Sequence, residues 1–133
     1  MKIGFACGVF DLYHPGHVLM LEECKNNCDF LIIGLNKVEY LGEGKNSPIF
    51  SFEERKLILQ SIKYIDKIIP YSSETELSNI LKNEKIDIRF LGDDYKKKPI
   101  TSPELTKEIY FCNRDHGYST SNFRKIINEN EKR

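Results

Sequence analysis

The sequence contains no apolar run that approaches the roughly 20 residues needed for a membrane-spanning helix. Its apolar N-terminal stretch is interrupted by Asp11 and His14, which is not the pattern of a secretory signal peptide. Both absences argue against a membrane-embedded or secreted protein. We therefore expect a cytoplasmic protein that does not bind a membrane.

An excess of charge of either sign is also missing, because 20 Lys and Arg residues balance 20 Asp and Glu residues. This balance argues against the broad basic surface of a nucleic-acid-binding protein, although a local basic pocket is compatible with it. Charged residues make up 30% and hydrophobic residues 40%, which is typical of a globular chain. With 133 residues there is room for one core but not for two, so we expect a single domain over residues 1–133.

Cysteine is scarce, and its four positions lack the paired spacing of a structural zinc site. Cys24 and Cys28 fall on one face of an expected helix, but no second closely spaced pair accompanies them. Cys7 and Cys112 fall in strand-like runs. We therefore expect four buried free thiols and no metal-ligating residues.

What the sequence does contain is the run GVFDLYHPGH at residues 8–17, which follows a short strand-like pattern at residues 3–7. Apolar residues from Val18 onward recur at three- and four-residue spacing and predict a helix. His14 and His17 therefore belong to a strand-to-helix turn, where unpaired N–H groups and the helix dipole attract anions. Two imidazoles at such a turn suggest a phosphate site. The alternative is a histidine pair that only caps the helix.

Strand and helix patterns alternate along the rest of the chain. Apolar runs predict strands at residues 29–35, 66–71, 87–91 and 109–112. Capping-box patterns predict helices from Ser51 and Ser73, and a last helix is expected from about Ser119, fraying into a charged tail at residues 129–133. Such alternation implies right-handed crossovers, so we expect an α/β, Rossmann-like three-layer fold with a five-stranded parallel sheet.

Ligands of open parallel sheets bind at the carboxyl ends of the strands. The loops that leave the first, fourth and fifth expected strands are residues 8–17, 92–94 and 114–121. All three loops are polar, and they should share one cleft. The sequence therefore predicts a single site.

These loops resemble signature motifs of the cytidylyltransferase branch of the nucleotidylyltransferase superfamily. Residues 8–17 have the form G-x-F-D-x-x-H-x-G-H, and residues 114–121 resemble R-T-E-G-I-S-T-[ST], with departures at Asp115 and His116. Residues 92–94 resemble the G-D-D turn of the family, in which a carboxylate accepts a hydrogen bond from the amino group of cytosine. The resemblance covers the chain from residue 2 to about residue 127.

The resemblance implies transfer of CMP from CTP to a small phosphorylated alcohol, with Mg²⁺ as cofactor. The catalytic residues that it implies are His14, His17, Lys45 and Arg114. The nucleotide-binding residues that it implies are Gly8, Val9, Phe10, Asp11, Gly16, Asp94, Gly117, Ser119, Thr120 and Ser121. The acceptor-binding residues that it implies are Arg55, which matches a residue supporting the substrate pocket, and Lys63, which replaces a frequent arginine.

Two other functions stay open on the sequence alone. One is an adenylyltransferase of the same fold that uses ATP and a sugar phosphate, since Tyr95 is shared with that branch. The other is a nucleotide-binding regulatory module without turnover. The family usually carries Ser-x-Asp where this chain has residues 36–38, Asn-Lys-Val, in a loop that helps to select the acceptor. Compact members usually form homodimers, so we expect a homodimer that binds CTP and a phosphorylated acceptor but no nucleic acid.

Overall fold

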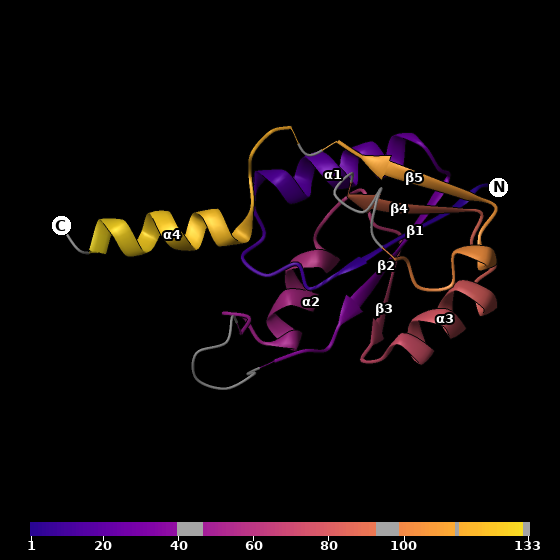
Figure 1. Ribbon diagram of the computed structural model, residues 1–133, viewed down its shortest axis with the longest axis horizontal. Coiled ribbons are helices and arrows are strands. Elements are labelled where there is room, and N and C mark those ends of the chain that lie inside the picture. Colours follow the sequence, from indigo (N-terminus) through magenta and orange to yellow (C-terminus); the bar gives the residue numbers. More distant parts are fainter. Residues whose placement is uncertain (40–46, 93–98, 114, 132–133) are drawn as a thin grey trace.

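Five parallel strands form one sheet in the computed structural model, which describes residues 1–39, 47–92, 99–113 and 115–131 (Figure 1). The strands are β1 (Ile3–Gly8), β2 (Phe30–Asn36), β3 (Lys67–Tyr71), β4 (Ile88–Gly92) and β5 (Glu108–Cys112). Their order across the sheet is β3-β2-β1-β4-β5. The strand order therefore reverses between β1 and β4, where the connecting loops diverge and a ligand crevice forms. All five expected strands are confirmed.

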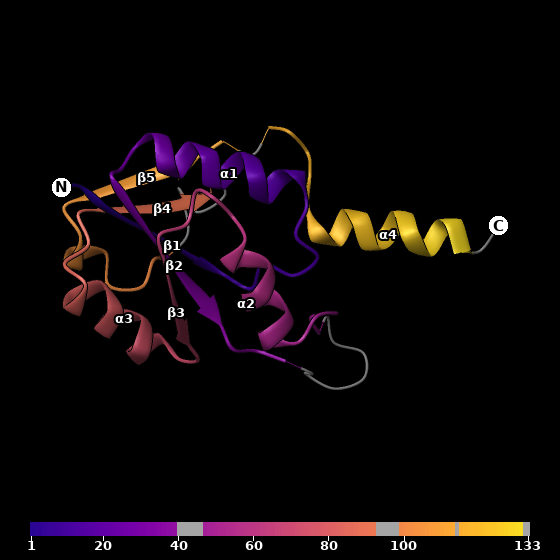
Figure 2. The same ribbon diagram turned by 180° about the vertical axis from the view of Figure 1, so that it is seen from behind.

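Helices cover both faces of the sheet, as the three-layer prediction required (Figures 1 and 2). The helices are α1 (Pro15–Asn26), α2 (Phe52–Gln60), α3 (Glu74–Asn83), the 3₁₀ turn η2 (Pro103–Leu105) and α4 (Thr120–Glu131). Helices α1 and α2 pack on one face, and α3 with η2 packs on the other. None of the helices in the described ranges is long and apolar enough to cross a membrane.

The helices begin where the capping patterns predicted. The hydroxyl of Ser51 accepts from the N–H of Glu54 at 3.1 Å, and the Glu54 carboxylate accepts from the N–H of Ser51 at 2.9 Å. Ser73 likewise accepts from the N–H of Glu76 at 3.1 Å. The Glu76 carboxylate, however, bonds to the N–H and hydroxyl of Ser72, so the second capping box is only half formed. Each cap stabilises its helix by about 1 kcal/mol.

The apolar core has two halves, one on each face of the sheet. Leu21 of α1 and Leu59 of α2 are buried on one face, and Leu77 and Leu81 of α3 are buried on the other. Burying a side chain of this size contributes about 1.5–3 kcal/mol. These two halves fix the sheet between its helices and hold the carboxyl ends of the strands in place.

Helix α4 differs from the prediction that the chain frays from residue 129, because the helix continues through Glu131. Glutamate is a good helix former, and this charged segment has no residue that would terminate the helix before Glu131. No described residue of α4 is buried, and the helix projects away from the sheet (Figures 1 and 2). Its residues Ile126 and Ile127 are 45% and 56% exposed.

The cysteines are free thiols, as expected, but only two of them are buried. Cys24 and Cys112 lie in the core with their Sγ atoms 3.9 Å apart. This contact and burial raise the pKa of the Cys24 thiol. Cys7 and Cys28 are half-buried, so the prediction of burial is wrong for these two. Cys7 lies near the end of β1, and Cys28 lies in the turn between α1 and β2, beyond the helix on which it was expected.

Candidate active site

The loop after β1 is held in an unusual backbone conformation by the side chain of Asp11. Phe10 and Leu12, on either side of it, have positive φ angles of 54° and 49°, which cost free energy in residues other than glycine. The Asp11 carboxylate compensates by accepting from the N–H groups of Ile49 at 2.7 Å and Phe50 at 2.9 Å. The loop is thus tied to the segment that precedes α2.

A third donor reaches Asp11 from α4, where Nη2 of Arg124 lies 2.7 Å from Oδ2. Burial would raise the pKa of the Asp11 carboxyl, but the N–H groups of Ile49 and Phe50 and the Arg124 guanidinium outweigh it and lower the pKa. Asp11 is therefore an ionised group whose oxygens are already engaged, and it does not suit a metal ligand. Among the described residues there is no group of three or more His, Cys, Asp or Glu that could hold a metal ion.

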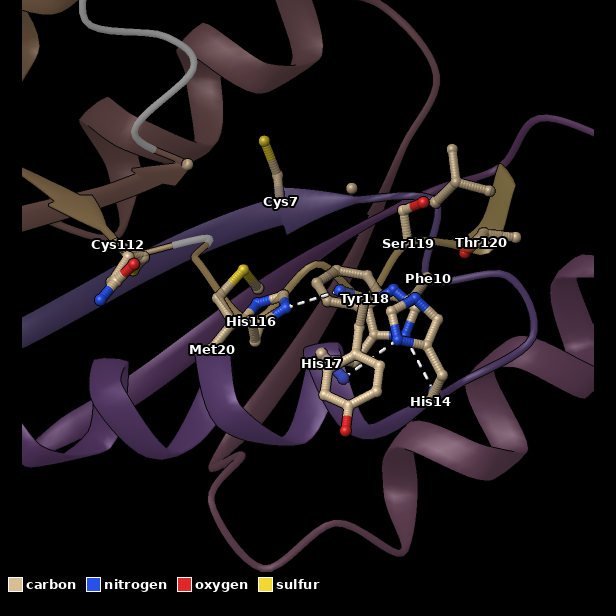
Figure 3. A pocket seen from close by; sticks show the side chains of 15 residues that line it. Cys7, Phe10, His14, His17, Met20, Cys112, His116, Tyr118, Ser119 and Thr120 are labelled. Atoms are coloured by element: carbon tan, nitrogen blue, oxygen red, sulfur yellow. Dashed lines mark hydrogen bonds between the residues drawn. The ribbon is translucent and has the colours of Figure 1, made fainter. Parts of the chain in front are cut away.

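His14 and His17 form a stacked pair at the first turn of α1, with ring centroids 3.9 Å apart (Figure 3). Nδ1 of His14 accepts from the N–H of Gly16 at 3.0 Å, and Nδ1 of His17 accepts from the N–H of His14 at 3.1 Å. The pair thus does cap the helix. Because Nδ1 accepts in both rings, a neutral ring carries its proton on Nε2, the nitrogen suited to donate to a phosphate. Capping and phosphate binding are compatible.

Gly16 is required for this arrangement by the space around it. A Cβ atom there would lie 2.8 Å from Cε1 of His14 and 2.9 Å from Cβ of Tyr118. Both distances are shorter than real carbon contacts, so any side chain would displace the His14 ring. Gly16 therefore acts by letting the ring approach the backbone, as its place in the motif suggested.

A cavity of about 230 Å³ opens beside the histidine pair (Figure 3). The end of β1 and the start of α1 form one wall, with Gly8, Phe10 and His17. The other wall is formed by Gly92 at the end of β4, by the end of β5, and by the residues that lead into α4: Cys112, Asn113, His116, Tyr118, Ser119 and Thr120. The described parts of the three predicted loops therefore do share one cleft.

The segment between β5 and α4 provides polar groups and a turn at this cavity. Gly117 has a φ of 76°, which favours glycine. Nδ1 of His116 accepts from the N–H of Tyr118 at 2.9 Å, so the His116 side chain stabilises this turn. His116 is one of the two positions at which the sequence departs from the family motif. Ser119 Oγ accepts from the N–H of Asn122 at 3.1 Å and caps α4. The segment is thus pre-shaped around the cleft.

Thr120 and Ser121 line a neighbouring cavity of about 410 Å³. His17 lines this cavity as well. The Thr120 hydroxyl donates to the carbonyl oxygen of Asp11 at 3.0 Å. Val9 lines both cavities, as do Phe10 and Thr120. His17 therefore lies between two connected spaces, an arrangement that suits a nucleotide with a chain of phosphates.

Arg55 is held by the backbone of the loops around the site. Its side chain is fully buried, and its guanidinium donates to the carbonyl oxygens of Phe50, Val9, Asn36 and Val38 at 2.5–3.2 Å. These bonds join the loops that follow β1 and β2 to the start of α2. Arg55 thus supports the walls of the site, in line with the pocket-supporting role that the resemblance implied, and its assignment to acceptor binding stays a prediction.

Lys63 lies away from the cleft that this chain forms. It precedes β3, so it lies at the amino edge of the sheet, whereas the histidine pair lies at the carboxyl edge. Its Nζ lies 5.2 Å from the centre of the Tyr64 ring. The predicted residues Lys45, Asp94 and Arg114 lie outside the described residues.

Helix α4 contributes side chains to the site that the motifs did not indicate. Phe123 lies 5.2 Å from the His14 ring, centre to centre, and the Tyr118 ring stacks on Phe123 at 6.1 Å. Arg124, which binds Asp11, also donates to the carbonyl oxygen of Ser47 at 2.8 Å. Thr120, Phe123 and Arg124 are spaced three and four residues apart and share one helix face, which is the signal that could have revealed them.

Comparisons with known proteins agree with this architecture. Residues 5–127 match the family described as cytidylyltransferase-like. The chain is 37% identical over 126 residues to a glycerol-3-phosphate cytidylyltransferase of Bacillus spizizenii, covering 94% of this chain and 96% of that protein. It is 36% identical over 134 residues to the bifunctional protein HldE of Aliarcobacter butzleri, covering 98% of this chain and 28% of HldE.

A similar fold is present in a solved structure described as the lipopolysaccharide core biosynthesis protein from Thermoplasma volcanium. The TM-score is 0.69 at 26% identity, and the match covers 86% of this chain and 99% of the other. The similarity thus extends over nearly all of both chains.

Proposed function

Because this chain belongs to the cytidylyltransferase-like family, we propose that it transfers CMP from CTP to a small phosphorylated alcohol resembling glycerol 3-phosphate. The products are a CDP-alcohol and pyrophosphate. The observation that carries the proposal is the stacked pair of His14 and His17 at the start of α1, beside a cleft formed by three loops. The name of the relative from Bacillus spizizenii supports the choice of nucleotide and acceptor.

The reaction needs no protein nucleophile. An oxygen of the acceptor phosphate, already an anion, attacks the α-phosphorus of CTP in line, and the bond from that phosphorus to the β-phosphate oxygen breaks. Pyrophosphate leaves with the bonding electrons. Catalysis then depends on positioning and on neutralising negative charge in the transition state. We assign this stabilisation to Nε2–H donors of His14 and His17, together with the cations of Lys45 and Arg114.

Around this pair, the loop of residues 8–11 and Gly16 would approach the phosphates closely. Gly117, Ser119, Thr120 and Ser121 would close over the nucleotide from the start of α4. We propose that Asp94 accepts the cytosine amino group. The oxygens of Asp11 are engaged, so Mg²⁺ would be held by the triphosphate and its own water molecules, as is usual for this ion.

The proposal is tested by measuring pyrophosphate release with Mg²⁺ in a grid of two nucleotides and several acceptors. CTP and ATP would each be combined with glycerol 3-phosphate, phosphocholine, phosphoethanolamine and a heptose phosphate, with EDTA as the metal control. We expect release with CTP and a glycerol-3-phosphate-like acceptor, and none after chelation. Release only with ATP would favour the adenylyltransferase alternative. Binding of CTP without release for any acceptor would favour a regulatory module.

We further propose that the protein acts as a homodimer in the cytoplasm. Apolar side chains next to His14 support pairing of two chains, since Val18, Leu19 and Tyr118 are 37–45% exposed and flank a shallow cavity there. Sedimentation equilibrium would test this directly. A mass near twice the 15.5 kDa of the chain is expected, and a monomer at micromolar concentration would contradict it.

A further inference from the structure

A second space adjoins the histidine cleft on the α3 side of the sheet, with a volume of about 400 Å³. The two cavities are continuous, because both are lined by Cys7, Gly8, Val9, Met20 and Gly92. The wall away from the histidines is formed by the ends of β2 and β3, the start of α3, β4 and residues 99–101. We call this space the α3-side cavity.

Arg89 of β4 contributes a buried cation to the α3-side cavity. The neighbouring Phe90 packs on the side of α1 and α2, and successive strand residues face opposite ways, so Arg89 faces α3. Its side chain is only 3% exposed. Nη1 donates to the carbonyl oxygen of Thr101, while Nε has no hydrogen-bond partner among the described residues. Within these residues no carboxylate forms an ion pair with it.

The two buried arginines in the described part of the chain therefore differ. Arg55 uses its donors on four backbone carbonyl oxygens and is satisfied by the fold alone. Arg89 lines a cavity, and its buried Nε–H has no hydrogen-bond partner among the described residues. A buried cation without an anion is costly, so a ligand that brings an anion to Arg89 gains a strong, charge-assisted hydrogen bond.

Two neutral side chains and one carboxylate line the cavity near Arg89. Burial raises the pKa of the Tyr71 hydroxyl, and the neighbouring Cys7 raises it further. Burial also raises the pKa of the Cys7 thiol, although Tyr71 and Arg89 oppose the rise. The carboxylate of Glu74, on the exposed first turn of α3, accepts from the hydroxyl of Thr101. The cavity is thus lined by one buried cation, Arg89, by the neutral side chains of Tyr71 and Cys7, and by the carboxylate of Glu74 at its exposed side.

We propose that Arg89 binds an acidic group of the acceptor, and that the acceptor occupies the α3-side cavity while the nucleotide occupies the histidine cleft. This inference rests on the proposed nucleotidyl transfer. The acidic group is either the reacting phosphate or a second oxyanion, a carboxylate or phosphate, farther along the molecule. A cation at this position disfavours acceptors with a quaternary ammonium group. Arg89 thus adds an acceptor-binding residue to Arg55 and Lys63, the two that the resemblance implied.

The first test separates acceptor binding from nucleotide binding in steady-state kinetics. Arg89→Met removes the charge at similar length, and Lys82→Met on the exposed side of α3 changes net charge equally. We expect Arg89→Met to raise the KM for the acceptor roughly 10–100-fold, the loss of one charge-assisted bond, and to leave the KM for CTP within about twofold. Arg89→Lys should recover part of the loss, and Lys82→Met should show none. Equal increases in both KM values would overturn the proposal.

The second test does not depend on turnover. Melting temperatures are measured without ligand and with inorganic phosphate, glycerol 3-phosphate or 3-phosphoglycerate. Without ligand, Arg89→Met should melt no lower than the wild type, because removing an unpaired buried cation removes a desolvation cost. Added anions should raise the melting temperature of the wild type but not of Arg89→Met. A lower melting temperature of the unliganded variant, or equal shifts in both proteins, would overturn the proposal.

These ligands also distinguish the two sources of the anion. A shift with glycerol 3-phosphate that requires Arg89 assigns the guanidinium to the reacting phosphate. If the shift in melting temperature requires Arg89 only with 3-phosphoglycerate, the guanidinium binds a second acidic group of the acceptor. If the wild type shows anion-dependent shifts through Arg89 but releases no pyrophosphate with any acceptor, the anion site stands and the proposed transfer fails.

Discussion

Arg124 donates from Nη2 to Oδ2 of Asp11 at 2.7 Å, and so joins two residues that are 113 positions apart in the sequence. The hydroxyl of Thr120, one turn earlier on α4, donates to the carbonyl oxygen of the same aspartate. Helix α4 has no buried residue, so these polar contacts and the Phe123 ring beside His14 attach it to the site. The link makes the histidine loop dependent on the C-terminal helix.

Replacing Arg124 with methionine should therefore affect both stability and turnover. The Asp11 carboxylate would lose its charged partner while staying buried, and we expect a loss of about 1–3 kcal/mol in the free energy of unfolding. We also expect kcat to fall, because the loop that carries the histidines loses one of its ties. Lys125→Met, the exposed neighbour on the same helix, is the control. Urea titration and pyrophosphate release measure the two effects, and an Arg124→Met protein indistinguishable from this control would refute the link.

Asp11 should make stability depend on pH in a defined direction. Its pKa in the folded protein is lowered, so its contribution is fully present above the pKa of the unfolded chain, about 3.9, and is lost as the pH falls through the folded value. The stability difference between the wild type and Asp11→Asn should thus be largest near neutral pH and shrink below about pH 4. Urea unfolding from pH 3 to pH 7 measures it. A difference that stays constant with pH would show that the charge of Asp11 is not what stabilises the loop.

The capping and catalytic roles of His14 can be separated by two substitutions. Asparagine caps helices well, so His14→Asn should keep nearly all of the stability, whereas His14→Ala should lose about 1 kcal/mol. Both variants remove the Nε2 donor, and both should lower kcat by about 10²–10³-fold. Turnover of His14→Asn near the wild-type rate would mean that the imidazole serves only as a cap. At His17, the third helical residue, glutamine can keep the bond to the N–H of His14, so His17→Gln and His17→Ala provide the corresponding comparison.

Arg55 should behave as a residue that supports the fold. Arg55→Met would leave four carbonyl oxygens without their donor, so we expect a loss of about 3–5 kcal/mol and a chain that is only marginally folded. Lys63→Met, at an exposed position, should leave the free energy of unfolding within about 0.5 kcal/mol of the wild type. Chemical denaturation compares the two. A stable Arg55→Met protein with a raised acceptor KM would support the acceptor-binding assignment.

The fold could be predicted because its signals are local. The apolar run at residues 29–35, which predicts β2, and the capping residues Ser51 and Ser73 each specify an element from a few neighbouring positions. The partners of Asp11 could not be predicted in this way, since they lie 38, 39 and 113 residues away and no local pattern marks them. For the same reason, a motif position such as Arg55 indicated importance without showing whether the side chain faces a ligand or the backbone.

The most direct test of the proposed chemistry follows the phosphorus atoms of CTP. The protein would be incubated with Mg²⁺, glycerol 3-phosphate and CTP labelled either at the α- or at the γ-phosphorus. Nucleotidyl transfer predicts that the α label appears in a CDP-alcohol and the γ label in pyrophosphate, and that both transfers nearly vanish in His17→Asn. Release of the γ label as inorganic phosphate, or of the α label as free CMP, would contradict it.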